Sequence, residues 1–144
     1  MTKRKIREHI FAMLFQADFH KEEELNEQAA LYMEGVENAS RKARTEIEEK
    51  FQAIVACIPQ LDACIEAKAK GWDLNRMAKA DVTILRLAIY EIIYDREVPN
   101  PVAINEAVEL SKQYGTDKSA SFINGILAAV AKEHPEEKTV DGND

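Results

Sequence analysis

Residues 80–94 read ADVTILRLAIYEIIY, and we expect the rest of the chain to be arranged around them. As a helix, this stretch points aliphatic side chains in nearly every direction, and a helix that is apolar all round has to be surrounded by protein. A buried strand is the competing interpretation, because isoleucine and valine favour strands. The length decides against it, since the stretch is far longer than a typical strand and holds no glycine or proline. The sequence therefore predicts a buried central helix from Ala80 to Tyr94.

Helical spacing of apolar residues continues on both sides of this stretch. The predicted helices cover residues 3–18, 21–34, 39–58, 59–70, 80–94, 101–114 and 118–132. No strand pattern or internal repeat is present. The sequence thus predicts an all-α fold, a single compact domain of about seven helices over residues 1–134. Residues 135–144 are polar and acidic and are predicted to form a disordered tail.

Several residues beside the helix ends carry specific expectations. Asp73 is predicted to cap the short turn before the central helix, and Thr116 or Asp117 to cap the last helix. Trp72 is expected to cover the central helix. Gly125 lies inside the last helix, where glycine costs about 1 kcal/mol relative to alanine, so we expect it to allow a close backbone approach.

The formal net charge is −7, so the chain as a whole does not resemble a nucleic-acid binder. The charge is uneven, however, because Lys3, Arg4, Lys5 and Arg7 open the chain with no acid among them. Lys3 and Arg7 are four residues apart and are expected to share a flank outside the core-facing stripe. Such a patch can bind phosphate on an acidic protein, since salt screens charges beyond about 8–10 Å. A solvated, frayed terminus is the alternative.

The sequence predicts no catalytic, metal or cofactor site. The three histidines are scattered, and none has a partner at metal-ligand spacing. Phosphate-cradling and nucleophile motifs are missing. Cys57 and Cys64 lie in apolar surroundings and form no CxxC, which favours reduced core residues of a cytosolic protein. The sequence shows no signal peptide and no membrane-spanning run.

Three stretches in the second half of the chain, ILRLAIYEI, PVAINEAVELSKQYG and S-x-x-FINGIL, together resemble the bacterial NusB family of transcription antitermination proteins. The opening KRKIREHIFAMLFQADF is similar to the basic first helix of that family. The resemblance implies a small, helical, cytoplasmic protein that is not an enzyme. It implies binding to boxA, a short single-stranded segment of ribosomal RNA leaders, together with the ribosomal protein NusE. The pair then helps to load an antitermination complex on RNA polymerase.

The resemblance also implies roles for particular residues. The RNA-binding residues would be Lys3, Arg4, Lys5, Arg7, Lys118, Ser119 and Phe122, and the NusE-binding residues would be Phe15 and Asp81. Lys118 replaces an acid of relatives, and Phe15 replaces a tyrosine. Ordinary roles stay open for two of them: Phe122 has the spacing of a core residue, and Asp81 that of an acid favoured at a helix start.

Two other classes of function compete with this one. A helical adaptor that binds only proteins would need no basic terminus. A similar helical module is also attached to ribosomal RNA cytosine methyltransferases, but this chain shows no cofactor-binding βαβ pattern.

Overall fold

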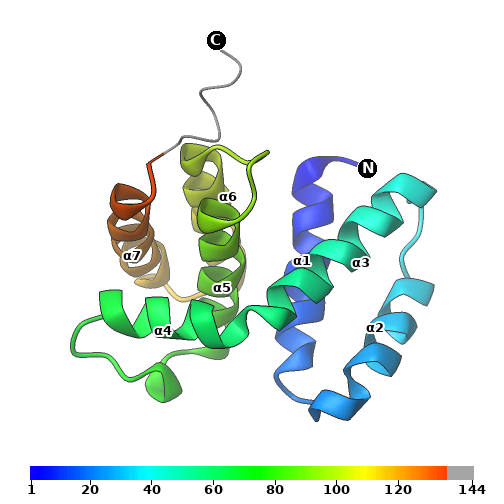
Figure 1. Ribbon diagram of the computed structural model, residues 1–144, viewed down its shortest axis with the longest axis horizontal. Helices are drawn as coiled ribbons and strands as arrows, with labels where there is room; N and C mark the ends of the chain where they lie inside the picture. The colour runs from blue at the N-terminus through cyan, green and yellow to red at the C-terminus, as the bar shows by residue number, and fades with distance from the viewer. Residues whose placement is uncertain (136–144) are drawn as a thin grey trace. The chain divides into compact units, whose positions relative to one another are not determined.

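The computed structural model describes residues 1–135, which form seven α-helices, two short 3₁₀ helices and no strand (Figure 1). The α-helices are α1 Lys3–Ala17, α2 Leu25–Glu34, α3 Arg41–Ala56, α4 Ile58–Lys68, α5 Lys79–Ile93, α6 Asn100–Tyr114 and α7 Ser119–Glu133. The 3₁₀ helices are η1 Glu22–Glu24 and η2 Leu74–Arg76. The all-α class and the number of about seven helices are confirmed. The tail predicted for residues 135–144 lies, apart from Pro135, outside the described residues.

The helices group into two compact units, the first covering Met1–Ala56 and the second starting at Cys57. The second unit is built around α5, which packs against α4, α6 and α7. Every residue from Val82 to Ile89 is buried, so the prediction of a helix enclosed by protein is confirmed. In Figure 1, α5, α6 and α7 lie side by side, and α4 runs across one end of them.

The first unit has a core of its own, so the expectation that the whole chain is organised around the central helix needs correction. Helix α1 packs against α3 and α2. The fully buried side chains are Ile10 of α1 and Ile47 and Ile54 of α3. The two units arise because α1 and α3 each carry an apolar stripe that the other covers. Whether residues 1–134 form a single domain stays a prediction.

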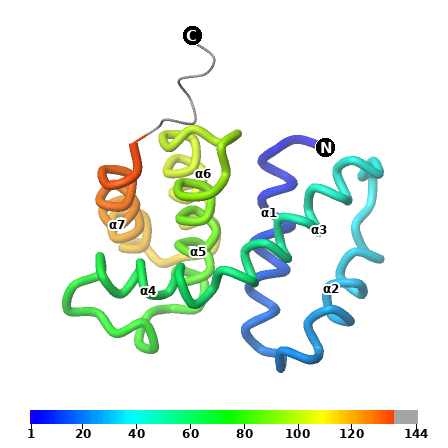
Figure 2. The backbone as a smooth tube through the Cα atoms, viewed as in Figure 1, coloured from blue at the N-terminus to red at the C-terminus, as the bar shows by residue number. Residues whose placement is uncertain are grey.

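The long connection between α4 and α5 matters for the site described below. Figure 2 shows the backbone leaving α4, turning through η2 and returning to the start of α5. Gly71 has a φ of +84°, a conformation that glycine adopts without steric cost. Asp73 caps η2 as predicted, since its Oδ1 accepts the Asn75 N–H at 3.0 Å.

Helix α7 begins differently from the prediction. Lys118 occupies the N-cap position and makes no side-chain cap, so neither Thr116 nor Asp117 has the capping role expected of it. The Thr116 N–H instead donates to Ser119 Oγ at 2.9 Å, and the Ser119 N–H donates to the Thr116 carbonyl at 3.0 Å. A tight turn therefore leads into the helix, and it occupies the Ser119 hydroxyl.

The prediction of a close backbone approach at Gly125 is wrong. The close approach occurs at Gly115 instead. A Cβ on Gly125 would meet nothing within 4 Å. A Cβ on Gly115 would lie 2.6 Å from the Cβ and Oγ of Ser119. Only glycine fits between α6 and the turn that begins α7.

An ion pair links α4 to the central helix. Arg86 Nε lies 2.7 Å from Asp62 Oδ1, and its Nη2 lies 2.9 Å from Oδ2. Arg86 is only 9% exposed, so its charge has to be compensated by such a contact. Arg86 therefore has a structural role, with Asp62 as an ion-pair partner.

Candidate nucleic-acid interface

The first turn of α1 presents three exposed cations, Lys3, Arg4 and Lys5, which we call the basic first turn. Thr2 caps the turn by accepting the Lys5 N–H on its Oγ1 at 3.0 Å. Lys3 Nζ lies 2.9 Å from Glu46 Oε2, and Lys5 Nζ lies 3.5 Å from Glu8 Oε1. Exposed pairs of this kind are worth about 0–1 kcal/mol, so a phosphate can displace the carboxylates at low cost.

Arg7 does not lie where the sequence placed it. The expected position was a flank outside the core-facing stripe, but Arg7 is only 8% exposed. The spacing explains this result, because Arg7 precedes Ile10 by three residues and Leu14 by seven, which puts it on their buried face. A role for Arg7 in RNA binding stays a prediction, and it is the residue of the basic terminus least accessible to solvent.

Phe15 belongs to a row of three aromatic rings that we call the aromatic row: Phe11, Phe15 and Phe19. The centroids of Phe11 and Phe15 lie 6.1 Å apart in a stacked arrangement, and those of Phe15 and Phe19 lie 5.4 Å apart edge to face. Phe15 is half-buried, whereas Phe19 is 62% exposed. The row therefore runs from the core to the surface. Phe19 was missed in the sequence, although the repeated spacing of four residues was visible there.

The predicted site residues of the second unit lie around one pocket of about 260 Å³. We call it the Trp72 pocket, and its polar and aromatic lining residues are Trp72, Arg76, Asp81, Thr116, Lys118, Ser119 and Phe122. The structure thus brings the three RNA-binding residues predicted for α7 together with Asp81, which was predicted to bind NusE. Trp72 and Arg76, from the connection between α4 and α5, were not predicted as site residues.

The aromatic wall of this pocket is the Trp72–Phe122 pair. Their ring centroids are 5.5 Å apart, with an angle of 62° between the ring planes. Trp72 is 57% exposed, so the expectation that it covers the central helix is wrong. Phe122 is half-buried, which leaves it room to contact both the core and a ligand. A pair of this kind on the surface is unusual, because large aromatic side chains gain most from burial.

The polar groups of the Trp72 pocket differ in accessibility. Arg76 and Lys118 are exposed cations. Ser119 is only 2% exposed. Asp81 is half-buried in the first turn of α5, and its Oδ1 is inaccessible to solvent and accepts no hydrogen bond from the described residues. The pocket therefore combines cations at its edge with a buried acceptor that lacks a donor.

Comparison with known proteins identifies the family. The NusB family profile matches residues 4–132. The chain belongs to the NusB family. It is 49% identical to the transcription antitermination protein NusB of Agathobacter rectalis over 91% of this chain and 100% of that one. It is 48% identical to the NusB of Lachnoclostridium phytofermentans over 90% of this chain and 98% of that one.

Solved structures agree with this assignment. A structure of T. maritima NusB superposes with a TM-score of 0.87 at 35% identity, and the match covers 96% of each chain. A chain in the crystal structure of a plectonemic RNA supercoil shares the fold, with a TM-score of 0.81 at 24% identity. Transcription antitermination by NusB implies both RNA and protein partners.

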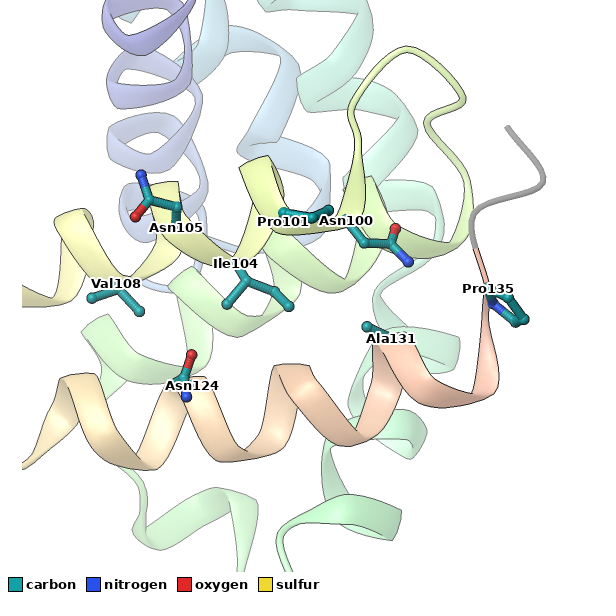
Figure 3. A pocket seen from close by; sticks show the side chains of 8 residues that line it. All are labelled: Asn100, Pro101, Ile104, Asn105, Val108, Asn124, Ala131 and Pro135. Carbon is teal, nitrogen blue, oxygen red and sulfur yellow. The ribbon is translucent and has the colours of Figure 1, made fainter. Parts of the chain in front are cut away.

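This NusB-family chain has a second, larger groove, of about 620 Å³, between α6 and α7. Figure 3 shows its walls: Asn100, Pro101, Ile104, Asn105 and Val108 from α6, Asn124 and Ala131 from α7, and Pro135. None of these side chains is charged, and none was predicted as a site residue. Without a cation the groove does not suit a phosphate, so its greater size does not make it the better candidate for RNA.

His9 and the two cysteines lie outside the Trp72 pocket. His9 Nδ1 lies 2.7 Å from the Tyr32 hydroxyl, and the pKa of His9 is lowered by burial and then by nearby Lys5, against the influence of Glu8. Cys57 and Cys64 are free thiols, and burial raises the pKa of Cys64.

Among residues 1–135 no group of three His, Cys, Asp or Glu residues is arranged to hold a metal ion. In the same range no helix is long and apolar enough to cross a membrane.

Proposed function

We propose that this NusB-family protein binds the boxA segment of ribosomal RNA leaders jointly with NusE. In this way it would help to assemble the antitermination complex on RNA polymerase in the cytoplasm. The observation that carries the proposal is the Trp72 pocket, because it joins exposed cations to the exposed ring of Trp72 and the half-buried ring of Phe122. Proteins hold single-stranded RNA by cations on its phosphates and by aromatic side chains against its splayed bases. The family membership supplies boxA and NusE as the particular partners.

The basic first turn provides a second contact for the RNA backbone. Lys3, Arg4 and Lys5 are exposed, and the acids that pair with Lys3 and Lys5 hold them only weakly. Each phosphate that a cation neutralises releases counterions, so affinity should fall as salt rises. Lys3, Arg4, Lys5 and Lys118 would thus provide most of the affinity and little of the sequence preference.

For NusE we propose a contact that includes Phe15. The aromatic row supports this proposal, since it carries apolar surface outward to Phe19, and exposed apolar patches mark sites of protein association. Asp81 can offer a charge-assisted hydrogen bond to a basic partner. The mechanism is tethering: each protein binds RNA weakly, and the pair presents a larger basic surface.

We also propose that the protein catalyses no reaction. None of the described side chains forms a nucleophile–base pair in the Trp72 pocket, where the polar groups are two cations, one carboxylate and the hydroxyls of Thr116 and Ser119, whose oxygens lie 3.3 Å apart. A sensitive methyl-transfer assay on ribosomal RNA should give no product, and incorporation above background would contradict this part of the proposal.

A titration of boxA RNA with and without NusE, at several salt concentrations, tests the proposal. We expect NusE to tighten RNA binding, whereas equal affinity in both series would remove the tethering mechanism. Changing Lys3, Arg4 and Lys5 together to Glu should weaken binding by about tenfold or more and flatten its salt dependence. Lys132→Glu is the matched control, because it reverses the charge of an exposed lysine in the last turn of α7, which is not among the proposed contacts.

The second candidate function is a helical adaptor that binds only proteins. The exposed Phe19 favours it, since an aromatic surface serves a protein partner as well as an RNA. The same titration separates the two functions. If the unaltered protein binds NusE but ignores boxA RNA at low salt, the adaptor is correct.

A further inference from the structure

We propose that the RNA backbone continues from the basic first turn of α1 onto the start of α3, where Arg41 and Lys42 bind its phosphates. The inference rests on the proposed function and deepens it, because it lengthens the RNA segment that the protein holds. Neither residue was predicted as a site residue from the sequence. Both are exposed in the first turn of α3.

An ion pair brings the start of α1 beside the start of α3. Lys3 Nζ lies 3.0 and 2.9 Å from the two carboxylate oxygens of Glu46. Lys42 precedes Glu46 by four residues, so their side chains lie on the same face of α3, one turn apart. Figure 1 shows α1 and α3 beginning at the same end of the first unit. The cations of the basic first turn therefore continue into the first turn of α3.

Both helices begin with cations in a place where acids are favoured. Neither α1 nor α3 has an acidic residue in its first turn. The helix dipole makes a helix start positive, so cations there raise the free energy of the folded protein. Phosphates bound by these side chains would remove the repulsion and accept hydrogen bonds from them. Two cationic helix starts that lie side by side thus favour a polyanion as ligand.

The start of α3 is held in place by other residues. Ser40 Oγ accepts the Ala43 N–H at 3.0 Å and so caps the helix. Arg44, the next cation of α3, is half-buried and donates to two backbone carbonyls at the end of α2. Arg44 is therefore a structural residue, whereas Arg41 and Lys42 are exposed on a turn that is already capped.

The surroundings favour RNA over an acidic protein as the ligand. The buried centre of a protein interface is mostly apolar, and none of the large apolar side chains of α3 is exposed. Phosphates need only charged donors, which Arg41 and Lys42 supply. Contacts to phosphate carry no sequence information, so the start of α3 should bind whichever nucleotides adjoin boxA.

Two RNAs test the inference on the full-length protein with NusE: boxA alone, and boxA lengthened by about eight uridines at each end. We expect the lengthened RNA to bind about tenfold more tightly at low salt, because it can reach the start of α3. Arg41→Gln combined with Lys42→Gln should abolish this gain. It should also lower the slope of log affinity against log salt by about 1.4 for the lengthened RNA, at about 0.7 for each phosphate contact.

Lys21→Gln combined with Lys132→Gln is the matched control. It removes the same number of positive charges from exposed residues beyond the end of α1 and in the last turn of α7. Its affinities and salt slopes should equal those of the unaltered protein. The Arg41 and Lys42 variant should be at least as stable to urea as the unaltered protein, since it removes only cations from a helix start.

Chemical labelling of lysine amines gives an independent readout of direct contact. Acetylation followed by mass spectrometry should show that Lys42 loses most of its labelling when the lengthened RNA is bound. BoxA alone should leave the labelling of Lys42 as it is in the free protein. Lys132 should be labelled equally in all three samples, and labelling of Lys42 that the lengthened RNA does not reduce would overturn the inference.

Failure of this inference is distinguishable from failure of the proposed function. If boxA binds but the lengthened RNA binds no more tightly, or the double variant keeps the full salt slope, the contact at α3 alone is overturned. If neither RNA binds even with NusE, the proposed function and the inference are overturned together. If the double variant keeps its RNA binding but loses NusE, Arg41 and Lys42 serve the protein partner and the inference is wrong.

Discussion

Two glycines of the second unit have opposite surroundings, and this difference decides what a methyl group does at each. Gly125 is exposed inside α7, with open space where a Cβ would be. A Cβ added at Gly115 would lie 2.6 Å from Ser119 and 2.8 Å from the Ser111 carbonyl oxygen. The φ of Gly115 is −100°, so space rather than backbone conformation requires glycine there.

We predict that Gly125→Ala stabilises the protein by about 0.5–1 kcal/mol, because alanine is the better helix former and nothing obstructs it. Gly115→Ala should destabilise it by about 1–3 kcal/mol, because Ser119 and its turn have to move. Urea unfolding measures both changes, and each variant serves as the control for the other. Equal effects of the two substitutions would contradict the distinction.

A single residue, His9, makes the stability of the folded protein depend on pH. Burial and Lys5 lower its pKa, so the folded protein favours the neutral ring. The unfolded chain therefore binds more protons, and stability falls as the pH drops through the ordinary histidine value of about 6.5. The contribution is complete above that value and is lost below it.

Thermal unfolding at about pH 7.5 and about pH 5.5 checks this prediction. The unaltered protein should lose more stability on acidification than His9→Gln, which has no titrating ring and can still form a hydrogen bond with Tyr32. The same loss in both proteins would show that other groups cause the acid sensitivity.

At the scale of elements, the Arg86–Asp62 pair fastens α4 to α5 inside the second unit. Both oxygens of Asp62 are engaged, and little of either side chain is exposed. Removing the Asp62 carboxylate would take away a two-point contact that compensates the Arg86 charge in poorly solvated surroundings. The pair therefore couples the position of α4 to the helix around which the second unit is built.

We predict that Asp62→Asn destabilises the protein by about 2–3 kcal/mol, somewhat below the loss measured for fully buried pairs. Glu109→Gln is the matched control, because Glu109 and Lys112 form an exposed pair at 3.2 Å within α6. That change should cost less than about 0.5 kcal/mol. If urea unfolding gives similar losses for both variants, the structural importance of the Arg86 pair is refuted.

For the whole molecule, the distribution of charge matters more than its sum. A net charge of −7 opposes RNA, yet Lys3, Arg4, Lys5 and Lys118 are exposed cations. Salt screens an exposed charge beyond about 8–10 Å, so acids farther than that from the RNA repel it little. The cations near the RNA therefore determine the electrostatic part of its binding. An acidic protein can then bind RNA with the salt dependence of a basic one.

Lys118→Asp tests this view, and it also restores the kind of side chain expected of relatives. We predict weaker boxA binding, and a slope of log affinity against log salt that is smaller by about 0.7, the value for one phosphate contact on a single strand. Lys132→Asp, a matched change in the last turn of α7, should leave the slope as it is. An unchanged slope in Lys118→Asp would mean that this lysine meets no phosphate.

Sequence alone was sufficient for the helices, the enclosed central helix and the family. A helical period shows which face of a segment is apolar, and this was enough to predict the helices. The motifs around Ile84, Pro101 and Phe122 are each a continuous stretch of sequence, and this was enough to recognise the family. The period does not show what covers that face. Arg7 has the spacing of the buried face of α1, but its burial was missed because a charged side chain was expected to lie outside that face.

Only the tertiary structure decided the composition of the Trp72 pocket and the tight contact at Gly115. The walls of the pocket come from the connection before α5, the first turn of α5 and the start of α7, which are far apart in the chain. Trp72 looked like a core residue because apolar side chains are usually buried, and nothing local indicated its exposure. Exposure and empty space are properties of how segments pack together, so no single segment of the sequence contains them.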